Sequence, residues 1–269
     1  MSSFVKTFET SKPTLINAEI ITNVSYGSHP KQKLDIYLPA NRSISSTKVL
    51  IVIHGGGWNS GDKSNISAHV DTLIKRLPDY AIFNINYRLA TNQATLFPAQ
   101  ENDIKAALNF IYNRSSEHLI SDKYVLLGIS AGAHLALLHG YKYTTPVRPK
   151  AIVSFFGPTD LTDMYNNPGN PYVPYSLLSV IGKTPTQDSL LYAQSSPINF
   201  VRSSSPPTLV FHGGLDPLVK SSQSYALINK LESASVNSEM VFYPTEGHGW
   251  HAINPVSYTH LTLPTTPYV

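Results

Sequence analysis

The chain has 269 residues, 42% of them hydrophobic, which suffices for one large core in a single α/β domain. Charged residues make up only 14%, below the roughly 25% usual for globular proteins, and the net charge of +3 includes no block of five like charges, which argues against nucleic-acid and membrane-surface partners. The absence of cysteine excludes a disulfide framework, a zinc–thiolate site and a cysteine nucleophile.

Apolar patterns alternate between strand and helix along the chain. Ala18–Tyr26 and Lys33–Leu38 are rich in β-branched residues and flank a turn, which predicts a hairpin. Apolar runs predict strands at Val49–Ile53, Tyr80–Tyr87, Tyr124–Leu127, Lys150–Phe156, Pro207–His212 and Ser238–Tyr243. Helices are predicted at Asn65–Leu77, Pro98–Tyr112, Ala131–Tyr141 and Ser221–Ser233. This alternation predicts an α/β fold, a mostly parallel sheet with helices on both faces.

Residues 157–199 interrupt this alternation with a stretch rich in Pro, Asn and Tyr, here called the excursion. Long connections of this kind either cover an active site or run irregularly over the surface, and the pattern leaves both interpretations open. Tyr165, Tyr172 and Tyr175 lie in it, either as an aromatic wall for a substrate or as packing residues.

Gly128-Ile129-Ser130-Ala131-Gly132 lies between a predicted strand and a predicted helix. In that context G-x-S-x-G forms a sharp turn that lifts the serine hydroxyl clear of the sheet. A serine needs a base within hydrogen-bonding reach and a third group to orient that base. Each of the last two predicted strands is followed by a suitable side chain, Asp216 in HGGLDPLV and His248 in EGHGW. The order serine, aspartate, histidine is that of α/β hydrolases, so we predict Ser130 as nucleophile, His248 as base and Asp216 as the orienting acid.

Asp160, which follows the preceding strand, is a rival for the acid. Its setting in GPTDL suits an N-cap, because a short carboxylate there accepts free backbone N–H groups. The run around Asp216 favours that residue instead.

His54-Gly55-Gly56-Gly57-Trp58 follows the strand that ends at Ile53. Acyl transfer places negative charge on a carbonyl oxygen, and glycines let backbone N–H groups approach it closely. We therefore predict an oxyanion hole formed by the N–H groups of Gly56, Gly57 and Ala131. His54 is predicted to orient this loop rather than to transfer protons.

These motifs together resemble the α/β-hydrolase superfamily, and within it the carboxylesterases similar to hormone-sensitive lipase and feruloyl esterases that carry an HGGGW loop. The similarity spans roughly residues 33–255 and includes the strings GISAGAHLAL, SFFGPTDL and GHGW. It implies an α/β-hydrolase fold and a structural ion pair between Arg88 and Asp103 beneath the oxyanion loop. The chain departs from many relatives at Ala133, where they have a second glycine.

The expected function is hydrolysis of carboxylic esters through an acyl-enzyme, with a small-molecule ester as substrate. The same machinery cleaves amides, so an arylformamidase or a serine peptidase remains an alternative. A non-catalytic binding module with the hydrolase fold is a third, although such a module would be expected to lack one of the three triad residues. No metal or cofactor motif is present, so neither is expected.

The last fourteen residues, 256–269, read VSYTHLTLPTTPYV, with no periodicity and no caps. They resemble a translated sequencing adapter, the alternative being a natural Thr/Pro-rich tail. We therefore predict a hydrolase domain over residues 1–255 and a non-native tail, with the final covering helix of the fold missing. The sequence as written has no signal-like apolar segment, which predicts a cytoplasmic protein.

Overall fold

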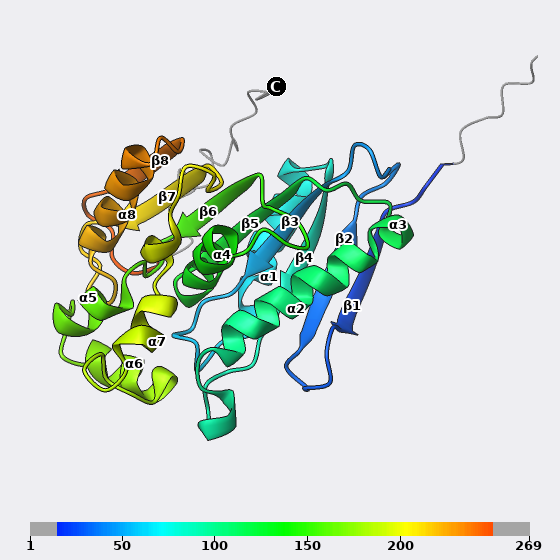
Figure 1. Ribbon diagram of the computed structural model, residues 1–269. Helices are drawn as coiled ribbons and strands as arrows, with labels where there is room; N and C mark the ends of the chain where they lie inside the picture. The colour runs from blue at the N-terminus through cyan, green and yellow to red at the C-terminus, as the bar shows by residue number, and fades with distance from the viewer. Residues whose placement is uncertain (1–14, 250–269) are drawn as a thin grey trace, which may run out of the picture.

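The computed structural model describes residues 15–249. Within them the chain forms one sheet with the strand order β1-β2-β4-β3-β5-β6-β7-β8 (Figure 1). The strands are β1 Glu19–Ser25, β2 Lys33–Leu38, β3 Lys48–Ile53, β4 Tyr80–Ile85, β5 Tyr124–Ile129, β6 Ala151–Phe155, β7 Thr208–Gly213 and β8 Ser238–Tyr243. The predicted hairpin is confirmed as the antiparallel pair β1–β2, and β2 also runs antiparallel to β4. The other neighbouring strands pair in parallel, as predicted.

Helices cover both faces of the sheet. The α-helices are α1 Ser67–Arg76, α2 Ala99–Asn113, α3 Ser115–His118, α4 Ala131–Lys142, α5 Leu161–Asn166, α6 Val173–Ile181, α7 Ser189–Gln194 and α8 Ser221–Ser233. The 3-10 helices are η1 Lys63–Ile66, η2 Gln93–Thr95 and η3 Pro197–Phe200. Every helix and strand predicted from periodicity is present, most with ends shifted by one or two residues.

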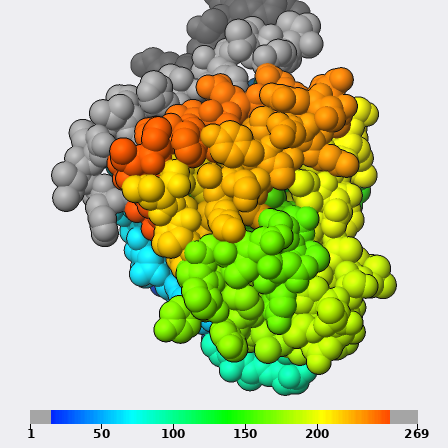
Figure 2. Space-filling view, turned by 90° about the vertical axis from the view of Figure 1, so that its left-hand side faces the viewer, coloured from blue at the N-terminus to red at the C-terminus, as the bar shows by residue number. Residues whose placement is uncertain are grey.

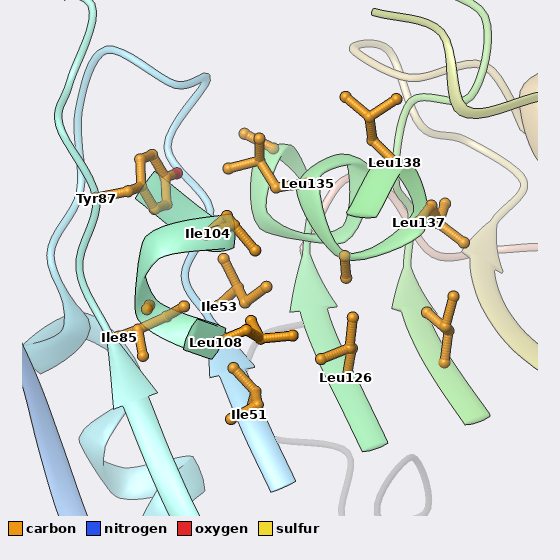
Figure 3. Close-up of a cluster of buried hydrophobic side chains, with 14 of the residues drawn as sticks. Ile51, Ile53, Ile85, Tyr87, Ile104, Leu108, Leu126, Leu135, Leu137 and Leu138 are labelled. Atoms are coloured by element: carbon orange, nitrogen blue, oxygen red, sulfur yellow. The ribbon is translucent and has the colours of Figure 1, made fainter. Parts of the chain in front are cut away.

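Alternation along the strands divides the core into two layers. Ile51 and Ile53 of β3 pack with α2 and α4, whereas Leu50 and Val52 pack on the opposite face with α1. Figure 3 shows the first layer, where side chains of α2 such as Ile104 face those of the strands. This packing fixes the carboxyl ends of the central strands relative to one another.

The predicted helix at Asn65–Leu77 was only partly right. It begins as the 3-10 turn η1 and becomes α-helical at Ser67. The Asp62 side chain caps the turn, and the Lys63 N–H donates to Asn86 Oδ1 at 2.6 Å. Because the Lys63 N–H is bonded to Asn86, which follows β4, the turn Lys63–Ile66 is held in place by that segment and the regular α-helix begins only at Ser67.

The excursion is not irregular throughout, because it contains the short helices α5, α6 and α7. Figure 1 shows them gathered at one end of the sheet. On α6, Val173, Leu177, Val180 and Ile181 are buried at helical spacing. The Phe97 N–H donates to the Val180 carbonyl at 2.9 Å, which ties α6 to the segment before α2.

The predicted tail at 256–269 lies outside the described residues, as does the expectation about a final covering helix. The boundary of the hydrolase domain at 255 therefore stays a prediction. Between residues 15 and 249, no helix combines the length and the apolar character needed to span a bilayer.

Candidate active site

Ser130 lies at the turn between β5 and α4. Its backbone angles are φ 53° and ψ −119°, a strained conformation for a residue with a side chain. The Ser130 N–H donates to the Phe155 carbonyl at 2.9 Å, which holds the turn against β6. The glycines of the motif are needed for close approach, because a Cβ on Gly128 would meet the backbone of Gly132. The local sequence therefore places a half-buried hydroxyl at the carboxyl end of the sheet.

The structure brings Ser130, His248 and Asp216 into one hydrogen-bonded line. Ser130 Oγ lies 2.9 Å from His248 Nε2, and His248 Nδ1 lies 2.7 Å from Asp216 Oδ2. An ionised carboxylate only accepts, so Nδ1 carries the proton and Nε2 is left to accept from the serine. The ring of Phe156 stands edge-on to the imidazole at 4.6 Å between centroids. This is the geometry required for a serine whose proton is to be removed.

The Asp216 side chain is fully buried yet suited to remain ionised. Its Oδ1 accepts the N–H groups of Leu218 and Val219, both at 2.9 Å. Burial acts to raise the pKa of Asp216, but the neighbouring His212 ring and the hydrogen bonds from His248 and the Val219 N–H outweigh it and hold that pKa well below its usual range. The carboxylate is therefore anionic at neutral pH and fixed in orientation.

Asp160 occupies the N-cap of α5, as its sequence setting predicted. One carboxylate oxygen accepts the N–H groups of Thr162 at 2.9 Å and Asp163 at 3.0 Å. The Asp160 N–H donates to Gln223 Oε1 at 2.8 Å, which anchors the start of the excursion to α8. This residue thus caps a helix, whereas Asp216 is the carboxylate bonded to His248.

The HGGGW loop lies beside Ser130. Gly56 and Gly57 have φ of 112° and 56°, conformations that favour glycine. A Cβ on Gly55 would come within 2.9 Å of the Ile129 carbonyl, so the loop backbone is close to the turn that carries the serine. Among residues 15–249 the N–H groups of Gly56 and Gly57 have no acceptor. The Ala131 N–H opens α4, where it has no partner within the helix.

His54 supports this loop, and an ion pair follows β4 nearby in the chain. The His54 ring stacks on Tyr87 at 4.4 Å, and its Nδ1 lies 2.7 Å from the Gly55 carbonyl. Burial lowers the pKa of His54, which fits the predicted orienting role. The predicted ion pair is present: Arg88 Nη2 lies 2.7 Å from Oδ1 of Asp103, a fully buried carboxylate that also accepts from the Arg88 Nε and backbone N–H.

A cavity of about 610 Å³ opens beside Ser130. Its lining residues come from the HGGGW loop (the predicted oxyanion loop) and the two residues after it, from the turn at Ser130, from the excursion, from residues 216–219, here called the acid loop, and from His248 and Gly249. Apolar side chains predominate: Trp58, Ile129, Phe156, Pro158, Met164, Tyr172, Val173, Leu177, Leu218 and Val219. Within the described part of the chain, no Asp, Glu, Lys or Arg lines it.

The excursion forms one wall of this cavity. Asn170 Nδ2 donates to the Pro217 carbonyl at 2.7 Å, which joins the excursion to the acid loop. In Figure 2 the excursion, green to yellow-green, lies against the yellow-to-orange segments that follow it in the chain. Of the three tyrosines considered for an aromatic wall, only Tyr172 lines the cavity. Tyr165 instead packs against Tyr192 at 6.0 Å, and Tyr175 is 72% exposed.

Two buried histidines next to the site were not predicted from sequence. His212 Nε2 lies 2.8 Å from the Val219 carbonyl and 3.4 Å from Asp216 Oδ2. His134 contacts the oxyanion loop through Trp58. His212 stands four residues before Asp216 in the string HGGLDPLV, so the sequence itself places the two side chains close together in the chain. Trp58 lies 76 residues from His134 in the chain, so no local pattern indicates that contact.

Residues 34–231 match the BD-FAE family of α/β-hydrolase esterases. The chain belongs to this family. The α/β-hydrolase fold and the similarity to esterases that the motifs indicated are therefore confirmed.

Two curated relatives illustrate the chemistry found among similar proteins. Esterase LipC of Mycobacterium tuberculosis is 24% identical over 245 residues, 86% of this chain and 60% of that protein. Kynurenine formamidase avaC of Aspergillus versicolor is 32% identical over 133 residues, 44% of this chain and 46% of that protein. The chain thus spans about half to three-fifths of the length of these curated relatives.

A solved structure described as a truncated form of carbohydrate esterase from gut microbiota is also similar. It superposes with a TM-score of 0.76 at 26% identity, over 87% of this chain and 90% of that one. The match therefore covers nearly the whole of both folded domains.

Proposed function

We propose that this BD-FAE protein hydrolyses carboxylic esters through an acyl-enzyme at Ser130. The observation that carries the proposal is the line from Ser130 Oγ through His248 to Asp216, with contacts of 2.9 and 2.7 Å. Family membership and the similarity to LipC support ester hydrolysis. The substrate is a small ester that reaches the serine through the adjoining cavity.

In the first step Ser130 Oγ attacks the ester carbonyl carbon while its proton moves to His248 Nε2. Asp216 stays ionised and stabilises the imidazolium through Nδ1–H. The carbonyl oxygen becomes negative and accepts hydrogen bonds from the N–H groups of Gly56, Gly57 and Ala131. Donors of this kind each contribute about 3 kcal/mol to the transition state.

The intermediate then collapses. The C–O bond to the alcohol breaks, and the alcohol oxygen takes the proton from His248 Nε2. His248 Nε2 then takes a proton from water, whose oxygen attacks the acyl carbon. The bond from that carbon to Ser130 Oγ breaks, Oγ takes the proton back from Nε2, and the acid leaves. Both halves of the reaction use the same base and the same oxyanion hole.

The cavity lining favours uncharged substrates. Apolar side chains of the excursion and the acid loop face the serine, and the polar side chains Asn59, Ser60, Asn170 and Ser176 are neutral. A charged acyl or alcohol group would lose its hydration there without gaining an ionic partner from the described residues.

Amide hydrolysis is the second candidate, favoured by the similarity to kynurenine formamidase avaC. The triad chemistry is common to esters and amides, so the triad itself does not separate them. N-formylkynurenine carries an amino-acid head with two charges, for which the described cavity lining offers no ionic partner. Ester hydrolysis is therefore the function that the site supports best.

The test is a turnover panel of p-nitrophenyl esters of rising chain length, feruloyl esters, acetyl-sugar esters and N-formylkynurenine. Ser130→Ala should abolish turnover, whereas Ser176→Ala, a matched change in the same cavity, should retain most of it. Turnover of N-formylkynurenine above that of every ester would establish the amide candidate instead. A folded protein that turns over none of them would favour the non-catalytic binding module.

A further inference from the structure

His134 is a fully buried histidine whose two ring nitrogens both have partners. It lies on the first turn of α4, and its backbone N–H donates to the Ser130 carbonyl at 3.0 Å. Nε2 is 2.7 Å from the Ser195 carbonyl, and Nδ1 is 3.2 Å from the indole Nε1 of Trp58. One side chain thus joins the helix of the nucleophile, the end of the excursion and the oxyanion loop.

The partners determine the tautomer. A carbonyl oxygen only accepts, so Nε2 must carry the proton and donate to Ser195. The indole N–H only donates, so Nδ1 must be the unprotonated acceptor. Burial lowers the pKa of His134 to about 4, so the ring is neutral at physiological pH and this pairing persists. The protonation state is thus matched to the contact with Trp58.

Trp58 needs such a contact. Its φ of 62° lies in the left-handed region, which is unfavourable for a bulky side chain. The Trp58 carbonyl accepts the Ala90 N–H at 2.9 Å, and its ring stands perpendicular to His134 at 5.1 Å between centroids. The backbone is therefore held from one side and the indole from the other.

We propose that His134 is a positioning residue that sets the oxyanion loop, through Trp58, relative to Ser130. The inference rests on the proposed function. The proposed donors Gly56 and Gly57 immediately precede Trp58, whereas the Ala131 donor and the nucleophile belong to the helix of His134. The hydrogen bond between the two rings therefore fixes the distance between the two halves of the oxyanion hole.

Trp58→Phe tests this most directly, because it keeps an aromatic ring and removes the N–H. Loss of one oxyanion donor costs about 10²–10³ in kcat, and a displaced loop weakens such donors only in part. We expect kcat to fall about tenfold. Trp58 also lines the cavity and Phe keeps an aromatic ring there, so KM should change much less than kcat. Binding of a trifluoromethyl ketone, whose adduct carries an oxyanion, should weaken in parallel with kcat and by more than binding of a neutral ester-like inhibitor.

Variants at position 134 separate hydrogen bonding from packing. His134→Asn can place an amide oxygen where Nδ1 stands and should retain more activity than His134→Leu, which removes both contacts. In the double variant with Trp58→Phe, the effect of His134→Leu on kcat should be smaller than in the wild-type background, because the pair acts as a unit. His139→Leu, a change of another buried histidine on the same helix, is the matched control and should leave kcat within twofold.

Wild-type kcat and ketone affinity in Trp58→Phe would overturn the proposal, and that variant still decides the matter if His134→Leu fails to fold. Failure of the proposed function is a different result, namely a folded wild-type protein without ester turnover.

Discussion

Replacing Asp216 by Asn is the sharpest perturbation of the site, because it exchanges one oxygen of a buried carboxylate for an NH₂ group. Asp216 Oδ1 accepts two backbone N–H groups, so the amide oxygen of the introduced asparagine would take that place. The amide NH₂ would then face His248 Nδ1, which lies 2.7 Å from Oδ2 in the wild type. An NH₂ group only donates here, so Nδ1 must give up its proton and Nε2 must carry one. The imidazole is then unable to accept the proton of Ser130.

The expected loss in kcat is about 10⁴-fold, equivalent to about 5.5 kcal/mol in the transition state. Asp160→Asn is the matched control, because Asn caps a helix about as well as Asp and the N–H groups of Thr162 and Asp163 keep an acceptor. That variant should keep kcat within about threefold. Steady-state turnover of a p-nitrophenyl ester, with circular dichroism to verify folding, measures both. A larger loss for Asp160→Asn than for Asp216→Asn would refute the assignment of the acid.

Three further outcomes are expected. Arg88→Ala leaves the buried Asp103 carboxylate without its ionic partner and should lower the free energy of unfolding, measured by urea titration, by about 2–3 kcal/mol. This is less than the full cost of breaking a buried pair, because Arg88 is partly exposed. A change under about 0.5 kcal/mol would contradict the prediction. His139 is buried with no hydrogen-bond partner for either ring nitrogen among residues 15–249, and burial lowers its pKa to about 4. In the unfolded chain the pKa of this histidine is near 6.5, so the unfolded state binds the proton first as the pH falls. The stability present above about pH 6.5 is therefore lost as the pH falls toward 4, by up to about 3 kcal/mol for this group. His139→Leu should flatten the pH dependence of the free energy of unfolding, and an unchanged slope would contradict this prediction. Gly132→Ala would place a Cβ against the carbonyls of Ile53 and His54 and should impair folding and activity, whereas Ala133→Gly should leave turnover within a few-fold; equal turnover of the two variants would show that the approach of α4 to β3 is not tight.

Much of the fold was predictable because its signals are local. β8 and α8 have the ends expected from Ser238–Tyr243 and Ser221–Ser233, since the apolar pattern and the ends coincide in the sequence. The strand expected to reach Tyr87 instead ends at Ile85. Asn86, which follows it, uses its side chain to hold the turn at Lys63, a contact between segments that strand periodicity does not encode.

The excursion shows where local signals are weaker. α5 and α7 are six residues each, too short for a hydrophobic period to be recognised against a background rich in Pro and Asn. α6 is different, because Val173, Leu177, Val180 and Ile181 have helical spacing and the helix was predictable in principle.

Within the site, Ser130, Asp216 and His248 were predictable because each follows a strand in a recognisable string. The contacts that hold them were not. The partners of His134 are 76 and 61 residues away, and the link from Asn170 to the Pro217 carbonyl spans 47 residues. Such contacts form only when the loops are folded against each other, and no local sequence pattern relates one loop to the other.

Covalent labelling shows whether Ser130 is the nucleophile. Incubation with a fluorophosphonate, followed by intact-mass and peptide mass spectrometry, should show one adduct per chain, located on Ser130. Ser130→Ala should remain unlabelled, whereas Ser176→Ala should label like the wild type. An adduct on another residue, or no adduct on a folded protein, would contradict the assignment of Ser130 as the nucleophile.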